Sequence, residues 1–98
     1  MKRRSQTLVF ENRPKLIAGM SVVGKKEGDG PLGKYFDRIE DDPKMGKNTF
    51  EKGETAMLTE AVEGAAAKAG LKISDIGALF AGDLLNQLVS SSYAARDL

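Results

Sequence analysis

A chain of 98 residues with a formal net charge of +1 and 30% charged side chains has room for one modest core and carries no large field of one sign. The charge balance argues against a nucleic-acid partner and against purely electrostatic attachment to a membrane. The sequence contains no cysteine and no histidine, which excludes disulfides, thiolate or imidazole metal sites and a cysteine nucleophile. Any chemistry must therefore rest on carboxylates, amides, hydroxyls and lysines.

The N-terminal quarter of the chain predicts two strands. Residues 2–4 are basic, but polar residues follow where a signal peptide needs a long apolar stretch, so we expect no cleaved signal. Residues 7–10 form a short β-type run, and residues 15–23 form a longer one bounded by Pro14 and Gly24. We predict a strand in each of the two runs.

Residues 24–47 predict a long loop, which in a compact domain is either functional or packed on something outside the chain. Within it, residues 28–35 (GDGPLGKY) nearly match a phosphate-binding loop. Tyr35 stands where the motif needs a serine or threonine hydroxyl to bind magnesium, and Pro31 removes a backbone N–H that would contact phosphate. A glycine-rich structural loop is therefore favoured. The acidic residues that follow lack the spacing of a calcium loop and are interpreted as a solvated cluster: Asp37, Glu40, Asp41 and Asp42.

The second half of the chain predicts helix, strand and helix. Asn48 with Glu51 has the spacing of a capping box, apolar residues recur at helical intervals, and Gly70 suits a left-handed C-terminal residue, so we predict a helix over 49–69. Residues 76–81 are apolar at nearly every position, which is typical of a parallel strand covered on both faces. We predict a last helix over 85–97.

This order predicts a βαβ crossover in an α/β fold, with too few strands to cover the faces of its own sheet. We therefore expect the chain to be the opening part of a larger α/β domain. The most apolar window, residues 76–85, is broken by Asp83 and is far shorter than the ~20 residues needed to span a bilayer, so no transmembrane helix is expected.

The candidate site follows the apolar strand. Ligands of open α/β sheets collect outside the carboxyl ends of the strands, and Asp83, Asn86 and Gln87 stand at that place. Asp83 can simply cap the following helix, or the three side chains can line a polar ligand pocket, or both. Residues 90–92 are serines without an activating base, and small-residue helix packing is favoured for them.

The chain resembles the stage V sporulation protein AD family of thiolase-fold proteins from spore-forming bacteria. The resemblance is carried by residues 6–12 (QTLVFEN), 29–37 (DGPLGKYFD), 50–52 (FEK), 79–87 (LFAGDLLNQ) and 92–96 (SYAAR). It implies that residues 1–98 are the N-terminal part of a single thiolase-like αβαβα domain, with 24–47 as a long loop. Leu8 stands where the family often has tryptophan, and Gly53 and Gly64 interrupt the predicted helix.

The resemblance further implies non-catalytic binding of dipicolinic acid, or of calcium dipicolinate, for uptake into the developing spore. It places Asp83 at the ligand pocket and implies no cofactor other than calcium as the chelate. It also implies membrane proteins of the same uptake system as partners, a homodimer, and a cytoplasmic or peripheral position at the inner membrane of the spore. Two alternatives stay open: a fragment of a thiolase-fold acyl-condensing enzyme, and an inactive truncated remnant.

Overall fold

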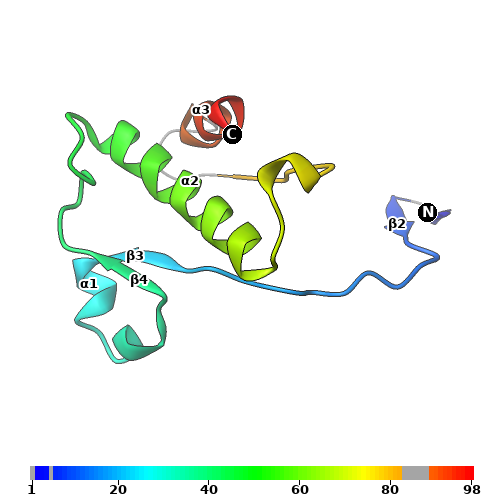
Figure 1. Ribbon diagram of the computed structural model, residues 1–98, viewed down its shortest axis with the longest axis horizontal. Coiled ribbons are helices and arrows are strands. Elements are labelled where there is room, and N and C mark those ends of the chain that lie inside the picture. Colours follow the sequence, from blue (N-terminus) through cyan, green and yellow to red (C-terminus); the bar gives the residue numbers. More distant parts are fainter. Residues whose placement is uncertain (1, 5, 83–88) are drawn as a thin grey trace.

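The computed structural model describes residues 2–4, 6–82 and 89–98 and shows a mixed α/β chain (Figure 1). Its elements, in chain order, are strands β1 (Lys2–Arg4), β2 (Thr7–Val9) and β3 (Val22–Gly24), helix α1 (Lys25–Gly28), the 3-10 turn η1 (Gly33–Tyr35), strand β4 (Arg38–Glu40), helix α2 (Phe50–Lys68), the 3-10 turn η2 (Ile73–Asp75) and helix α3 (Val89–Asp97).

The described strands form two small sheets. β1 pairs antiparallel with β2, and β3 pairs parallel with β4, with Val22 opposite Arg38 and Gly24 opposite Glu40. The parallel pair is connected through α1 and η1. This arrangement confirms a mixed α/β chain with a small parallel sheet, which is the part of the predicted fold class that the structure bears out.

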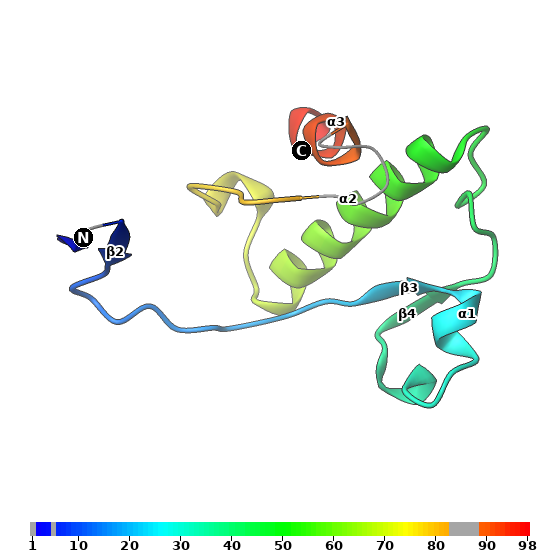
Figure 2. The ribbon, with the colours of Figure 1, turned by 180° about the vertical axis from the view of Figure 1, so that it is seen from behind.

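Helix α2 organises the molecule. It lies between the β3–β4 pair on one side and α3 on the other, and the two opposite views agree on this order (Figures 1 and 2). The apolar core of the described residues is very small: Ala66 of α2 and Ala94 of α3 are the buried apolar residues, with 8% and 1% exposed area. Most of the large apolar side chains therefore remain in contact with solvent.

The predicted helix over 49–69 is confirmed as α2, but its predicted cap is wrong by one residue. The Thr49 hydroxyl accepts a hydrogen bond from the Lys52 N–H at 3.2 Å, so Thr49 and not Asn48 is the N-cap. A threonine oxygen at this position satisfies one of the free N–H groups of the first turn. Gly70 has φ of 73°, which confirms the left-handed residue predicted after the helix.

Two glycines inside α2 are explained by close approach of other segments. A Cβ atom on Gly53 would lie 2.8 Å from the carbonyl carbon and oxygen of Lys44, and a Cβ on Gly64 would lie 2.8 Å from Cγ of Met20. The backbone before α2 and the chain before β3 therefore pass directly over the helix at these two points. Glycine lowers helix propensity at both positions, but its lack of a side chain permits the close packing.

Two of the three predicted strands, over 15–23 and 76–81, are largely wrong. Within 15–23, strand structure is limited to Val22 and Val23, because β4 offers partners only to Val22, Val23 and Gly24. Residues 76–81 form no strand, and Phe80 is 94% exposed. A strand is defined by hydrogen bonds to a neighbouring strand. In the described part of the chain, neither segment has such a neighbour along most of its length.

The prediction of a long loop over 24–47 is also corrected, because this segment contains α1, η1 and β4. It, and not α2, makes the connection between the two paired parallel strands. The short strand predicted over 7–10 is confirmed as β2. The last helix is confirmed from Val89 to Asp97, while the beginning predicted at Leu85 lies outside the described residues.

Candidate functional site

The three predicted ligand-binding residues, Asp83, Asn86 and Gln87, lie outside the residues that the structure describes. The structure does describe both flanks of this stretch. On one side the chain is extended and exposed up to Gly82, and on the other side α3 begins at Val89. Two hollows, lined by residues of α2, α3 and the chain around η2, border these flanks.

The first flank borders an apolar cleft of about 320 Å³ between α2, α3 and the chain after η2. Residues 76–79 form one wall, Val62 of α2 forms another, and Ala95 and Leu98 complete it. The cleft offers few polar groups to a ligand. Its chemistry suits the packing of apolar side chains.

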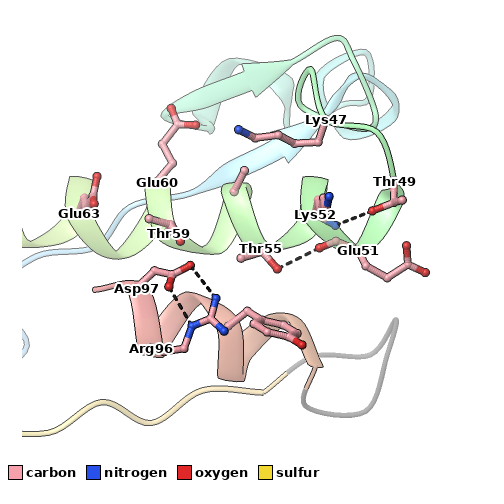
Figure 3. Close-up of a pocket in the computed structure, with 12 residues that line it drawn as sticks. Lys47, Thr49, Glu51, Lys52, Thr55, Thr59, Glu60, Glu63, Arg96 and Asp97 are labelled. Carbon is pink, nitrogen blue, oxygen red and sulfur yellow. Dashed lines mark hydrogen bonds and ion pairs between the residues drawn. The ribbon is translucent and has the colours of Figure 1, made fainter.

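The second flank, α3, faces a wider groove of about 820 Å³ along α2 (Figure 3). Helix α2 supplies most of one wall, with its N-cap residue and Lys47 at one end, and the last turns of α3 supply the other wall. The residues that line the groove are Lys47, Thr49, Glu51, Lys52, Thr55, Ala56, Thr59, Glu60, Glu63, Tyr93, Arg96 and Asp97.

Charges in this groove are mixed in sign and partly paired. Arg96 binds Asp97 with an Nε–Oδ1 distance of 3.0 Å, and both side chains are seen on α3 (Figure 3). The Arg96 guanidinium lies 4.6 Å from the centre of the Tyr93 ring. The Asp97 carboxylate is the main cause of a raised Arg96 pKa. Because lysine and arginine side chains lie among carboxylates here, the groove has no concentrated positive charge that would attract an anionic ligand.

A polar network that the sequence analysis did not predict joins three distant segments at Asp37. The Asp37 carboxylate accepts hydrogen bonds from the Ser21 N–H at 2.8 Å and from the Ser21 hydroxyl at 3.0 Å, and it pairs with Lys68 at the end of α2. Lys68 also donates to the Gly19 carbonyl at 3.1 Å. The Lys68 hydrogen bond, followed by those from Ser21, lowers the pKa of Asp37 to about 2.

A second network fastens β4 to α2. Nε of Arg38 donates to Glu60 at 2.7 Å, and its Nη2 donates to Glu40 at 2.6 Å. The hydrogen bond to Glu40, followed by the one to Glu60, raises the pKa of Arg38. No sequence motif could have revealed either network, because partners such as Arg38 and Glu60 are 22 positions apart and meet only in the folded chain.

The acidic cluster is explained by local structure. The Asp42 carboxylate accepts backbone N–H groups of Lys44 at 2.9 Å and Gly46 at 2.8 Å, and these bonds lower its pKa. The Asp42 N–H in turn donates to Glu40 at 3.1 Å. Among the described residues, no group of three or more carboxylates is placed to hold a metal ion. The cluster therefore shapes the turn before α2.

The loop that nearly matches a phosphate-binding motif also has a structural explanation. Gly33 is buried against the Gly28 backbone, too closely for any side chain, and a Cβ on Gly28 would meet Ile39 of β4. Lys34 lies 5.1 Å from the centre of the Tyr35 ring. The glycines therefore permit a compact connection between β3 and β4, which supports the interpretation of this segment as a structural loop.

Within the serine run of α3, Ser91 contributes to packing. Ser91 is buried, with 5% exposed area, and lies one helical turn before the buried Ala94. Small side chains at this spacing share a helix face and allow close approach to a neighbouring helix. Ser92 is exposed. Ser91, but not the exposed Ser92, thus fits the small-residue packing predicted for residues 90–92.

The described part of the molecule is thus a mixed α/β segment whose polar networks hold its elements together. The model of the family described as Stage V sporulation protein AD (SpoVAD) matches residues 4–98, so the chain belongs to this family, whose role is in sporulation. This confirms the resemblance found in the sequence.

A relative is the stage V sporulation protein AD of Bacillus subtilis (strain 168), which is 41% identical over 93 residues. The match covers 95% of this chain and 28% of the relative, in an N-terminal part. The chain therefore spans less than a third of the length of that relative. Among the described residues, no helix combines the length and apolar character needed to cross a membrane.

Proposed function

We propose that the chain belongs to a non-catalytic binding protein for dipicolinic acid, or its calcium chelate, that serves uptake into the developing spore. The observation that carries this proposal is the family match over residues 4–98, which includes the stretch that joins a carboxylate to two amides after an apolar run. The binding protein would have a thiolase-like fold of which this chain forms the N-terminal part. The mixed α/β character of the described residues is compatible with that fold.

In this proposal Asp83, Asn86 and Gln87 contribute to the ligand pocket. Dipicolinate is a dianion at neutral pH, so an ionised Asp83 would repel it unless a calcium ion lies between the two. Carboxylate and amide oxygens are suitable calcium ligands, and amide N–H groups can donate to the carboxylates of the acid. We therefore favour the calcium chelate as the bound species.

The proposal also includes the partners of the binding protein and its location in the cell. The binding protein would act beside membrane proteins of the same uptake system, at the inner membrane of the spore or in the adjoining cytoplasm, and it would form a homodimer. Residues 1–98 contain no cysteine and no histidine, so they supply none of the side chains on which the alternative, an acyl-condensing enzyme, would depend for its nucleophile or base. We accordingly propose binding without catalysis.

The proposal is tested by calorimetric titration of the chain, and of the B. subtilis relative, with calcium dipicolinate. Asp83→Ala should weaken binding by about 10- to 100-fold, the usual effect of removing a hydrogen bond or ion contact to a charged group. The matched control is Asp29→Ala, which removes an exposed carboxylate that forms an ion pair with Lys25, four residues earlier in the sequence. Equal affinity of the parent and the Asp83→Ala variant would remove Asp83 from the pocket.

The ionic state of the ligand is tested separately. If calcium bridges the ligand and Asp83, removal of calcium should abolish binding of dipicolinate to the parent chain. Asp83→Asn removes the repelling charge, so it should bind calcium-free dipicolinate at least as well as the parent does. Tight binding of calcium-free dipicolinate by the parent would contradict the bridging arrangement while leaving dipicolinate as the ligand.

A further inference from the structure

The first fifteen residues hold a positive charge that the rest of the chain does not share. They contain five basic residues and one acidic residue, a formal charge of +4, whereas the whole chain has +1 and residues 16–98 therefore have −3. The basic residues are Lys2, Arg3, Arg4, Arg13 and Lys15, and the acidic one is Glu11. Charge asymmetry of this kind is typical of a segment that contacts an anionic surface.

Most of this charge belongs to a part of the molecule that stands apart from the helices. Strands β1 and β2, together with Phe10 directly after them, are here called the N-terminal hairpin. Within the described residues β1 and β2 form a sheet of their own, separate from the β3–β4 pair. The hairpin lies away from α2 and α3 in both views (Figures 1 and 2). A two-stranded hairpin without a helix or further strand to pack on is at best marginally stable in water.

The hairpin also presents apolar side chains to solvent. Leu8, Val9 and Phe10 are 58%, 42% and 55% exposed. Successive strand residues point to opposite faces, so both faces of β2 carry apolar groups. In the register of the two strands Val9 stands opposite Lys2, and Leu8 stands opposite Arg3. Basic and apolar residues are therefore direct neighbours across one thin ribbon.

We propose that the N-terminal hairpin docks on the surface of an anionic lipid bilayer. Anionic headgroups attract the basic residues, and the apolar boundary just beneath them can bury the side chains of residues 8–10. A nucleic acid would match the charge but would leave the aliphatic side chains in water. The inference deepens the membrane location in the proposed function and rests on that location alone. Because no dipicolinate is involved, vesicle binding and the calorimetric titration can fail independently.

The test is co-sedimentation of the chain with phosphatidylcholine vesicles, either pure or containing about 30% phosphatidylglycerol as the anionic lipid. The chain should bind the anionic vesicles and should be released by high salt, which screens the attraction. Binding of equal strength to the pure phosphatidylcholine vesicles would overturn the proposal. Absence of binding to the anionic vesicles would also overturn it and would leave an acidic protein surface as the partner of the hairpin.

A matched pair of charge variants assigns the binding to the hairpin. The triple change Lys2→Gln, Arg3→Gln and Arg4→Gln should weaken binding to the anionic vesicles by roughly 100-fold. The control removes the same charge from three exposed lysines outside the hairpin and should retain most of the binding: Lys25→Gln, Lys26→Gln and Lys34→Gln. Equal losses in the two variants would show that net charge, and not the hairpin, governs the binding.

A fluorescent probe reads the lipid contact directly and does not depend on the charge variants. The chain contains no tryptophan, so a single introduced indole reports on its own surroundings. Phe10→Trp should show a blue shift of its emission on addition of anionic vesicles. Tyr35→Trp is the control, because Tyr35 is 70% exposed but lies in η1, and it should show no shift. A shift at position 35 without one at position 10 would place the lipid contact elsewhere and overturn the proposal.

Discussion

Lys68, the last residue of α2, pairs with Asp37, the residue immediately before β4, across 31 positions of sequence. The same carboxylate accepts two hydrogen bonds from Ser21, which lies immediately before β3. One aspartate thus joins the beginnings of both parallel strands to the end of the long helix. Since so few apolar side chains are buried, this contact is a principal link between the sheet and α2.

Stability should fall in acid because of Asp37. Its pKa is lowered from 3.8 to about 2 in the folded chain, so the folded state favours the ionised carboxylate. The resulting stability is fully present above the unfolded pKa and is lost as the pH falls through the folded pKa, that is, between about pH 4 and pH 2. Thermal unfolding followed by circular dichroism from pH 6 to pH 2 measures this loss.

The Asp37 contribution is isolated by comparison with Asp37→Asn, which should lower the melting temperature at pH 6 and reduce the difference between pH 4 and pH 2. Lys68→Met should have a similar effect, because Lys68 is the first cause of the lowered Asp37 pKa. An unchanged acid profile in both variants would show that other carboxylates govern the acid sensitivity.

The cap of α2 gives a second prediction. Thr49→Ala should lower the free energy of unfolding by about 1 kcal/mol, because the Lys52 N–H loses its side-chain acceptor. Asn48→Ala is the matched control and should have a much smaller effect, since Asn48 precedes the cap. Urea unfolding followed at 222 nm measures both. The reverse order would restore Asn48 as the cap predicted from the sequence.

The two helix glycines should respond differently to alanine. By propensity alone, each substitution would stabilise a helix by up to ~1 kcal/mol. At Gly53 the new methyl group would meet the rigid Lys44 backbone, so Gly53→Ala should destabilise the chain. At Gly64 it would meet the flexible Met20 side chain, which can move, so Gly64→Ala should be close to neutral. Urea midpoints of the two variants distinguish these outcomes, and equal midpoints would contradict the close approach at Lys44.

The contact between α2 and α3 gives a fourth prediction. Ala94 is 1% exposed, so Ala94→Leu should overpack the contact and lower the free energy of unfolding by about 1–3 kcal/mol. Ala95→Leu, on the neighbouring exposed face beside the apolar cleft, should be tolerated. Chemical denaturation of both variants measures the difference. If both leucines were tolerated equally, α3 would not pack on α2 through Ala94.

Local patterns in the sequence predicted the elements that depend on local forces. Helix α2 follows from apolar residues at helical intervals, and the end of that helix follows from Gly70, whose φ of 73° is accessible to glycine without strain. The last helix and the short strand at Thr7–Val9 were predicted for similar reasons. The family itself was also evident from short stretches of residues, and the match over 4–98 confirmed it.

Strand pairing could not be predicted in this way, because a strand needs a partner that the local pattern does not supply. Residues 15–23 and 76–81 have the composition of strands, yet in the described structure only the end of the first finds a neighbour, in β4. β4 itself lay in a segment predicted as loop, since its three residues carry two charges and one apolar side chain. Its pairing with β3 depends on the compact turn that Gly33 permits.

For the candidate site, the sequence alone provided the residue types, a carboxylate and two amides at Asp83, Asn86 and Gln87, and the family to which they belong. Tertiary structure decided which polar groups outside that stretch are occupied by structural bonds. Asp37, Lys68, Arg38 and Glu60 come from segments far apart in the chain, and their ion pairs exist only once β4 lies beside α2. Helix periodicity acts over a few residues and is visible in sequence, whereas contacts across 22 or 31 positions are fixed by the fold.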